Sequence, residues 1–206
     1  MAEFIKIYDD NPNPNAIEKV VKVLRKGGLI IFPTDTVYGL ACDINNTKGV
    51  ELMARIKGVK AINANFSFVC SDLSNLSDYV KQIDSTTFRI LKRALPGPYT
   101  FILPGARSLP SIFKRKRTVG IRIPDNTIAL EIVKQLGNPI ISTSIRDEDE
   151  IVEYTTDPEL IHEKWKKHVD LVIDGGYGDN QASTVIDLSE DEPKVIREGK
   201  GSLEIF

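Results

Sequence analysis

The sequence predicts one α/β domain spanning residues 1–206, built around a mixed β-sheet. Helical and extended patterns alternate through most of the chain, and several extended segments joined by short links follow near its end. Strands separated by helices favour parallel pairing, whereas strands joined by short links favour antiparallel pairing. Both kinds of pairing are therefore expected in one sheet.

Apolar residues spaced three or four positions apart predict the helices, and short apolar runs predict the strands. The first helix carries its apolar stripe from Ile17 to Leu24, with Asn15 as the expected N-cap and Gly27 at its end. Further helices are expected over 47–57, 85–95, 128–136 and 158–169. Asn126 is the expected N-cap and Gly137 the expected end of the helix 128–136, and Asp157 followed by Pro158 is the expected start of the helix 158–169. Strands are expected over 29–33, 65–70, 100–103, 118–123, 139–143, 171–174, 183–188 and 194–197. The charged stretch 147–153 is expected to be a loop.

Composition and missing motifs exclude several classes of protein. The net charge of −2 argues against a general nucleic-acid coat protein, although a local basic patch stays open. Cys42 and Cys70 are the only cysteines, which fits a reducing compartment. No secretory signal and no apolar run of about 20 residues is visible, so we expect a cytoplasmic protein without a membrane partner. Neither a Walker motif nor a glycine-rich dinucleotide motif is present, so a nucleotide would be bound by other means.

Two segments place polar side chains at or on predicted strands. Thr34 and Asp35 directly follow the strand 29–33, and strand ends of open α/β sheets line ligand crevices. A turn in which both side chains bond to nearby backbone explains them equally well. In the strand 118–123, alternation turns the apolar odd-numbered residues toward the core and Thr118, Gly120 and Arg122 to the other face. An arginine beside a glycine favours a carboxylate or phosphate site over a weak surface ion pair.

Hydroxyl and cationic side chains recur later in the chain. The run Ser142–Ser144 ends an apolar segment, and Ser183 begins another strand that is followed by Arg197. Such hydroxyls and nearby backbone N–H groups can hold a phosphate, although serine and threonine are also common in turns. The basic run Lys114, Arg115, Lys116 and Arg117 could contact RNA phosphates, but a short run of this kind is more often a solvated loop.

Taken in order, these segments resemble the YrdC/YciO superfamily, whose best-known members are threonylcarbamoyl-AMP synthases. The runs F-P-T-D-T-V-Y-G-L at 32–40 and P-G-P-Y-T-F-I-L at 96–103 are the most specific matches. The stretches 55–70, 118–124, 141–144 and 183–199 also match, so the resemblance covers nearly the whole chain. Residues 65–74 and 187–199 look closest to the YciO branch.

The resemblance implies a fold and a reaction. The fold is a twisted, largely open mixed sheet of the YrdC-like/RibB-like kind, flanked by helices, with a concave cationic cleft. The reaction joins L-threonine, bicarbonate and ATP into threonylcarbamoyl-AMP and pyrophosphate, for modification of adenosine 37 in tRNA. The implied contacts with ATP fall to Lys57, Thr118, Ser144 and Arg197. The implied contacts with threonine and its carboxylate fall to Thr34, Arg122, Ser142 and Ser183. The resemblance implies no nucleophile and no general base. It implies no dedicated metal site either, because Mg²⁺ arrives with ATP.

Three positions depart from the pattern of the synthases. Val59 replaces the arginine of their K-x-R pair, with Lys60 beside it. Cys70 stands at the position of a histidine, and Arg146 stands at that of an asparagine. A protein that binds double-stranded RNA or tRNA through Lys114–Arg117 without catalysis is therefore the alternative. A monomer is the default expectation, and a dimer is left open.

Overall fold

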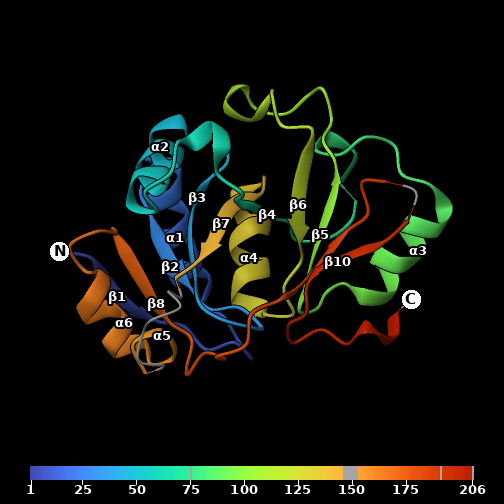
Figure 1. Cartoon of the computed structure of the whole chain (residues 1–206). Coiled ribbons are helices and arrows are strands. Elements are labelled where there is room, and N and C mark those ends of the chain that lie inside the picture. Colours follow the sequence, from blue (N-terminus) through green and yellow to red (C-terminus); the bar gives the residue numbers. More distant parts are fainter. Residues whose placement is uncertain (75, 146–152, 191, 206) are drawn as a thin grey trace.

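The computed structural model describes residues 1–74, 76–145, 153–190 and 192–205 (Figure 1). Arg146 and all but the last residue of the expected loop 147–153 lie outside the described residues, and Glu153 begins a helix. The described strands form one ten-stranded sheet in the order β1-β8-β2-β3-β7-β4-β6-β5-β9-β10. Both parallel and antiparallel pairs occur, so the mixed sheet predicted from the sequence is confirmed.

The strands are short. They are β1 (Glu3–Lys6), β2 (Ile30–Phe32), β3 (Gly39–Asp43), β4 (Ser67–Val69), β5 (Tyr99–Pro104), β6 (Thr118–Arg122), β7 (Ile140–Ser144), β8 (Leu171–Asp174), β9 (Thr184–Asp187) and β10 (Lys194–Arg197). The α-helices are α1 (Pro14–Arg25), α2 (Thr47–Ile56), α3 (Ser85–Ala94), α4 (Thr127–Leu136), α5 (Glu153–Thr156) and α6 (Pro158–Trp165). None of these described helices combines the length and apolar character needed to cross a membrane.

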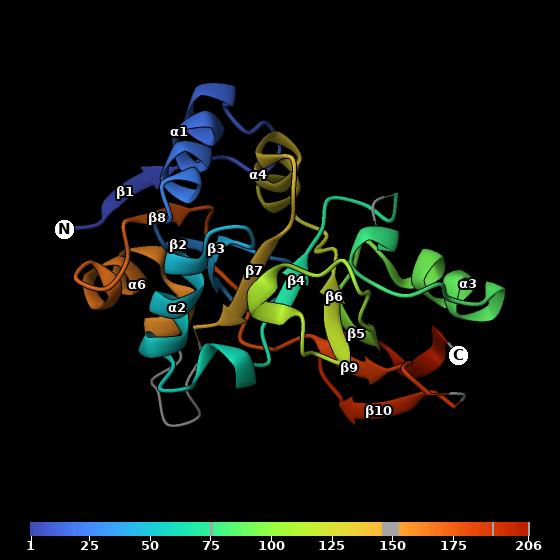
Figure 2. The same ribbon diagram turned by 90° about the horizontal axis from the view of Figure 1, so that it is seen from above.

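Helices cover both faces of the sheet. The apolar stripes of α1 and α4 pack together on one face, above buried residues of β2, β3, β4 and β7 (Figure 2). The buried sides of α2, α3 and α6 belong to the larger cluster on the opposite face. Because alternate residues of a strand face opposite sides, these layers determine which side chains stay uncovered. Toward the β5–β9 end of the sheet, the face that carries α1 and α4 is left open for a site.

Local capping follows the sequence with one correction. The N-cap of α1 is Asn13, whose side chain accepts hydrogen bonds from the N–H groups of Asn15 and Ala16. The prediction of Asn15 was wrong because Pro14, which has no N–H to lose, begins the helix. The caps predicted for α4 are confirmed, since Asn126 accepts from Ala129 N–H and Gly137 ends the helix with a φ of 85°.

Two strands, β1 and β3, lie outside the predicted set. β3 joins the antiparallel partners β2 and β7 near the middle of the sheet, and all five of its residues are buried. It thereby places the loop between β2 and β3, residues 33–38, beside the strands that carry the later serine and arginine motifs. This placement brings the loop 33–38 and these motifs together at the site.

Candidate functional site

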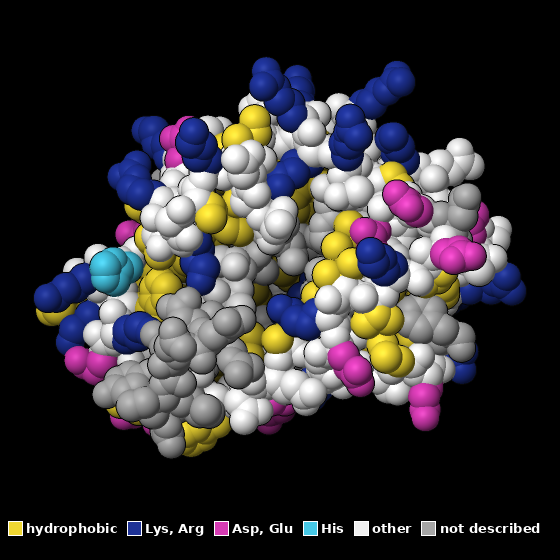
Figure 3. Space-filling model, in the orientation of Figure 1, with side chains coloured by type: hydrophobic (Ala, Val, Ile, Leu, Met, Phe, Trp, Pro, Cys, Tyr) yellow, Lys and Arg dark blue, Asp and Glu magenta, His cyan; other side chains and the backbone are white. Residues whose placement is uncertain are grey.

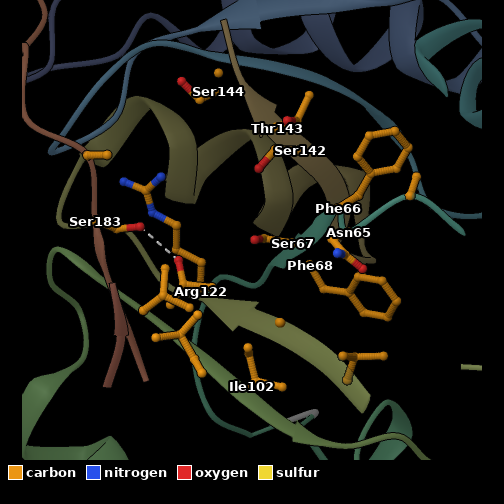
Figure 4. A pocket seen from close by; sticks show the side chains of 18 of the residues that line it. Asn65, Phe66, Ser67, Phe68, Ile102, Arg122, Ser142, Thr143, Ser144 and Ser183 are labelled. Atoms are coloured by element: carbon orange, nitrogen blue, oxygen red, sulfur yellow. Dashed lines mark hydrogen bonds between the residues drawn. The ribbon is translucent and has the colours of Figure 1, made fainter. Parts of the chain in front are cut away.

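A cavity of about 470 Å³ lies over the central strands β7, β4, β6, β5 and β9 (Figure 4). Its floor follows from strand register, because Ser67 pairs with Ser142 on one side and with Gly120 on the other. Ser144 and Thr118 lie two residues along β7 and β6, so they face the same side. A sheet face that elsewhere buries apolar residues therefore presents hydroxyl groups here.

Gly120 keeps the middle of this floor open. A Cβ atom built on Gly120 would lie 3.3 Å from Thr100 Cγ2 and 3.4 Å from Ser67 Oγ, which is tight but not prohibitive. Any larger side chain would have to extend into the cavity. Gly120, which the sequence places on the same strand face as Arg122, thus lies at the floor of the site.

Gly120→Leu is expected to fill the cavity and weaken ATP binding. Overpacking costs about 1–3 kcal/mol, which corresponds to roughly 5- to 150-fold in affinity. Isothermal titration calorimetry with ATP measures the effect, with Gly120→Ala as the graded control because one methyl group needs only small shifts of its neighbours. Equal ATP affinity in the leucine variant would mean that ATP does not occupy this cavity.

Arg122, at the end of β6, is only 9% exposed and ties that strand to the loop between β2 and β3. Its Nη2 donates to Asp35 Oδ1 at 2.7 Å, to Thr34 Oγ1 at 3.0 Å and to Thr36 Oγ1 at 2.6 Å. These acceptors outnumber the hydrogens of one Nη2 and must share them. Burial lowers the pKa of Arg122, and the Asp35 carboxylate opposes this shift. Arg122 and Asp35 are therefore a buried ion pair, not a solvated surface pair.

The pair leaves hydrogen-bonding capacity unused. Arg122 Nε and Asp35 Oδ2 are buried and have no hydrogen-bond partner among the described residues. Arg122 also lines the cavity, as Figure 4 shows. Buried polar atoms are nearly always satisfied in folded proteins, so a small shift that brought Nε to a bound anion would supply the missing acceptor.

Ser183 and Arg197 form the opposite side of the cavity. The hydroxyl groups of Ser183 and Thr100 lie 2.9 Å apart. The dashed line in Figure 4 marks this hydrogen bond. Arg197, on the edge strand β10, donates from Nε and Nη2 to the Ser183 carbonyl oxygen at 3.1 Å and 2.9 Å. Although the residue as a whole is exposed, its guanidinium group is thus held against the cavity.

The structure gathers six of the eight predicted ligand contacts around the cavity. They are Thr118, Arg122, Ser142, Ser144, Ser183 and Arg197. The other two, Lys57 and Thr34, contact residues that line the cavity. Lys57 Nζ donates to the Ser144 carbonyl oxygen at 3.4 Å, and the Thr34 hydroxyl donates to the Val37 carbonyl oxygen at 2.8 Å while it accepts from Arg122. Thr34 lines a neighbouring open hollow, together with Pro33, Asp125 and Lys200.

The basic run 114–117 divides into two parts. Lys114, Arg115 and Arg117 are exposed, whereas Lys116 is half-buried and lines the cavity. Figure 3 shows Lys and Arg side chains gathered along the upper rim of the hollowed face, over α2 and the segment before β6. The four residues therefore do not act as one surface.

Several site residues were missed by sequence reasoning. Ser67 and Thr100 both line the cavity, and only their alternation with apolar neighbours signals this. Sequence reasoning left Asp35 open between a crevice residue and a turn residue, and it did not identify Asp35 as the partner of Arg122. Cys70 does not line the cavity; burial raises its pKa to about 12, and its N–H donates to the Arg122 carbonyl oxygen at 2.9 Å. Val59, at the position of the arginine in the K-x-R pair of the synthases, is 44% exposed.

The described residues contain no group of three or more His, Cys, Asp or Glu side chains that could hold a metal ion. Of the described residues that line the cavity, Asp187 alone carries a carboxylate. The cavity is therefore lined mainly by hydroxyl, cationic and apolar groups, which suits an anionic organic ligand.

Comparison with known proteins identifies relatives that share this architecture. The protein YciO of Escherichia coli K12 is 41% identical over 209 residues, and its crystal structure matches with a TM-score of 0.90 at 42% identity, each covering both chains fully. The threonylcarbamoyl-AMP synthase of Bacillus subtilis is 29% identical over 200 residues, covering 95% of this chain and 57% of that protein. The structure of P. abyssi Sua5 complexed with L-threonine matches with a TM-score of 0.86 at 28% identity, covering 98% of this chain and 58% of that one. A family model that bears the names Sua5, YciO and YrdC, described as "Telomere recombination", matches residues 22–199. The chain therefore belongs to the Sua5/YciO/YrdC family.

Proposed function

We propose that this protein catalyses ATP-dependent formation of threonylcarbamoyl-AMP, or of a closely related carbamoyl adenylate, from L-threonine and bicarbonate. The observation that carries the proposal is one cavity that collects two arginines and four predicted hydroxyl groups from distant parts of the chain. The similarity to a threonylcarbamoyl-AMP synthase and to Sua5 complexed with L-threonine supports it. The reaction would take place in the cytoplasm and serve tRNA modification.

The chemistry needs no nucleophile from the protein. The amine of threonine and bicarbonate give a carbamate and water. A carbamate oxygen then attacks the α-phosphorus of ATP, the bond between the α-phosphorus and the bridging oxygen breaks, and pyrophosphate leaves with that oxygen. The reactants are anionic at every stage, so catalysis consists of positioning and fixed positive charge. A magnesium ion carried by the triphosphate would share that charge.

Each predicted side chain has a role in this scheme. Arg122 would bind the threonine carboxylate, which would give its unused donor an acceptor, with Ser142 and Ser183 beside it. Thr34 would act indirectly by holding Arg122. Contacts with ATP would come from Thr118, Ser144 and Arg197, with Lys57 behind Ser144.

Product analysis tests the proposal directly. Purified protein is incubated with ATP, bicarbonate and threonine, and the mixture is analysed by mass spectrometry for the carbamoyl adenylate and for pyrophosphate. Product is expected only when all three substrates are present, and parallel reactions with other amino acids define the amine. Absence of adenylate and pyrophosphate with every amino acid would contradict an enzymatic function.

Binding of double-stranded RNA or tRNA is the second candidate. The observation that favours it is the exposure of Lys114, Arg115 and Arg117. They belong to the segment before β6, over which Figure 3 shows part of the cationic rim. Contacts with RNA phosphates read shape and charge and need no cavity. Binding of a tRNA without turnover of ATP would favour this candidate.

A further inference from the structure

Lys116 differs from the other cations of the basic run in where its amine lies. Lys116 Nζ donates to the Ala64 carbonyl oxygen at 2.8 Å and to Asn65 Oδ1 at 3.2 Å. Both acceptors belong to the segment that leads into β4, and Lys116 lines the cavity together with Asn65 and Phe113. The side chain thus crosses from the β6 segment to the β4 segment along one wall of the cavity.

The charge of this amine is not balanced within the described protein. Both of its acceptors are neutral oxygens, and no described carboxylate forms an ion pair with it. Burial lowers the pKa of Lys116, and no neighbouring charge offsets that effect. An ammonium group also has a further N–H beyond the two donated here. A half-buried cation on a cavity wall that is bonded only to neutral oxygens can accept a bound anion there.

The position of Lys116 indicates which anion it would meet. Lys116 precedes Thr118 at the start of β6, whereas Arg122 ends the same strand. Four residues of strand span about 13 Å, so Lys116 and the carboxylate-binding arginine lie at different ends of the cavity. Threonine held at Arg122 is too short to reach Lys116 as well, but the phosphates of a nucleotide bound beside it can do so.

We propose that Lys116 is an anion-binding residue of this cavity and contacts a phosphate group of the bound nucleotide. The inference rests on the proposed function, because it takes ATP as the ligand. It also separates Lys116 from the RNA hypothesis, since Lys116 is half-buried and lines the cavity, whereas Lys114, Arg115 and Arg117 are exposed.

Lys116→Gln tests the proposal, with Arg115→Gln as the matched control from the exposed part of the same run. Binding of ATP, tripolyphosphate, adenosine and threonine is measured by calorimetry, and melting temperatures are recorded for all variants. Lys116→Gln is expected to weaken binding of ATP and tripolyphosphate by roughly 10- to 100-fold. Binding of adenosine and threonine should stay within about twofold, as should every affinity of Arg115→Gln. Lys116→Arg should retain part of the phosphate affinity because it keeps the charge.

A spectroscopic readout distinguishes ligand contact from a structural role. A bound phosphate stabilises the charged amine, so ATP should raise the apparent pKa of Lys116 in an NMR titration of its ¹³Cε signal, whereas adenosine should not. Equal phosphate affinity in Lys116→Gln and Arg115→Gln would overturn the proposal while leaving the proposed reaction intact. An equal loss for all four ligands, together with a lower melting temperature, would show that Lys116 only ties two segments. A wild-type protein that binds neither ATP nor tripolyphosphate would overturn both proposals.

Discussion

Replacing Arg122 with alanine is expected to abolish ATP-dependent pyrophosphate release. Arg122 lines the cavity as a buried cation, and removal of one charge-stabilising group from an active site typically reduces kcat by about 100- to 1,000-fold. The reduction in kcat should reach or exceed the upper end of this range, because the variant also leaves the Asp35 carboxylate without its partner. A coupled pyrophosphate assay at saturating ATP and threonine measures the change.

Two further variants make this result specific. Arg122→Lys keeps the charge but loses the planar donor group, so it should retain only partial activity. Arg115→Ala removes an exposed arginine near the rim and should leave pyrophosphate release unchanged. Binding of tRNA should barely respond to Arg122→Ala. If tRNA binding weakened and pyrophosphate release did not, the RNA-binding candidate would replace the enzyme.

Asp35→Ala is expected to give the largest loss of stability among single substitutions at the site. The Asp35 side chain is 8% exposed and pairs with an arginine side chain that is 11% exposed. Removing one partner of a buried ion pair leaves the other charge uncompensated, which costs about 3–5 kcal/mol. Equilibrium unfolding in urea should show the loss as a lower midpoint with an unchanged slope.

The control for Asp35 is a double variant. Asp35→Leu combined with Arg122→Met removes both charges, so it should recover much of the stability while remaining inactive. Glu131→Ala breaks an exposed ion pair with Lys134 and should change stability by less than about 1 kcal/mol. A loss in Asp35→Ala no larger than that in Glu131→Ala would mean that the buried pair contributes no special stability.

The fold was predictable wherever local signals determine an element. The caps of α4 at Asn126 and Gly137, and the Asp157–Pro158 start of α6, are features of one short segment and are confirmed. β1 and β3 lack such signals. β1 exposes most of its residues and pairs with β8, more than 160 residues away. β3 reads Gly-Leu-Ala-Cys-Asp, and glycine, alanine and aspartate are poor strand formers, so its tertiary position determines its conformation.

The site shows the same division between local and distant information. Alternation along one strand was enough to place Thr118, Gly120 and Arg122 on a common face. It could not reveal that Asp35 pairs with Arg122, because that contact depends on how β3 positions the preceding loop. Nor could a run of four cations show that Lys116 alone turns inward, since its acceptors lie about 50 residues earlier in the chain. Cross-strand register supplied what the single sequence lacked.

The hydrogen bonds from Arg197 to the Ser183 carbonyl oxygen have a consequence for biosynthesis. One wall of the cavity comes from β9 and β10, which join the sheet through β5, a strand made about 80 residues earlier. A nascent chain therefore carries only part of the binding surface until translation has passed Arg197. A ligand stabilises only the state that binds it. Bound nucleotide can therefore stabilise the completed sheet, but it cannot stabilise the intermediates in which only the earlier strands have assembled.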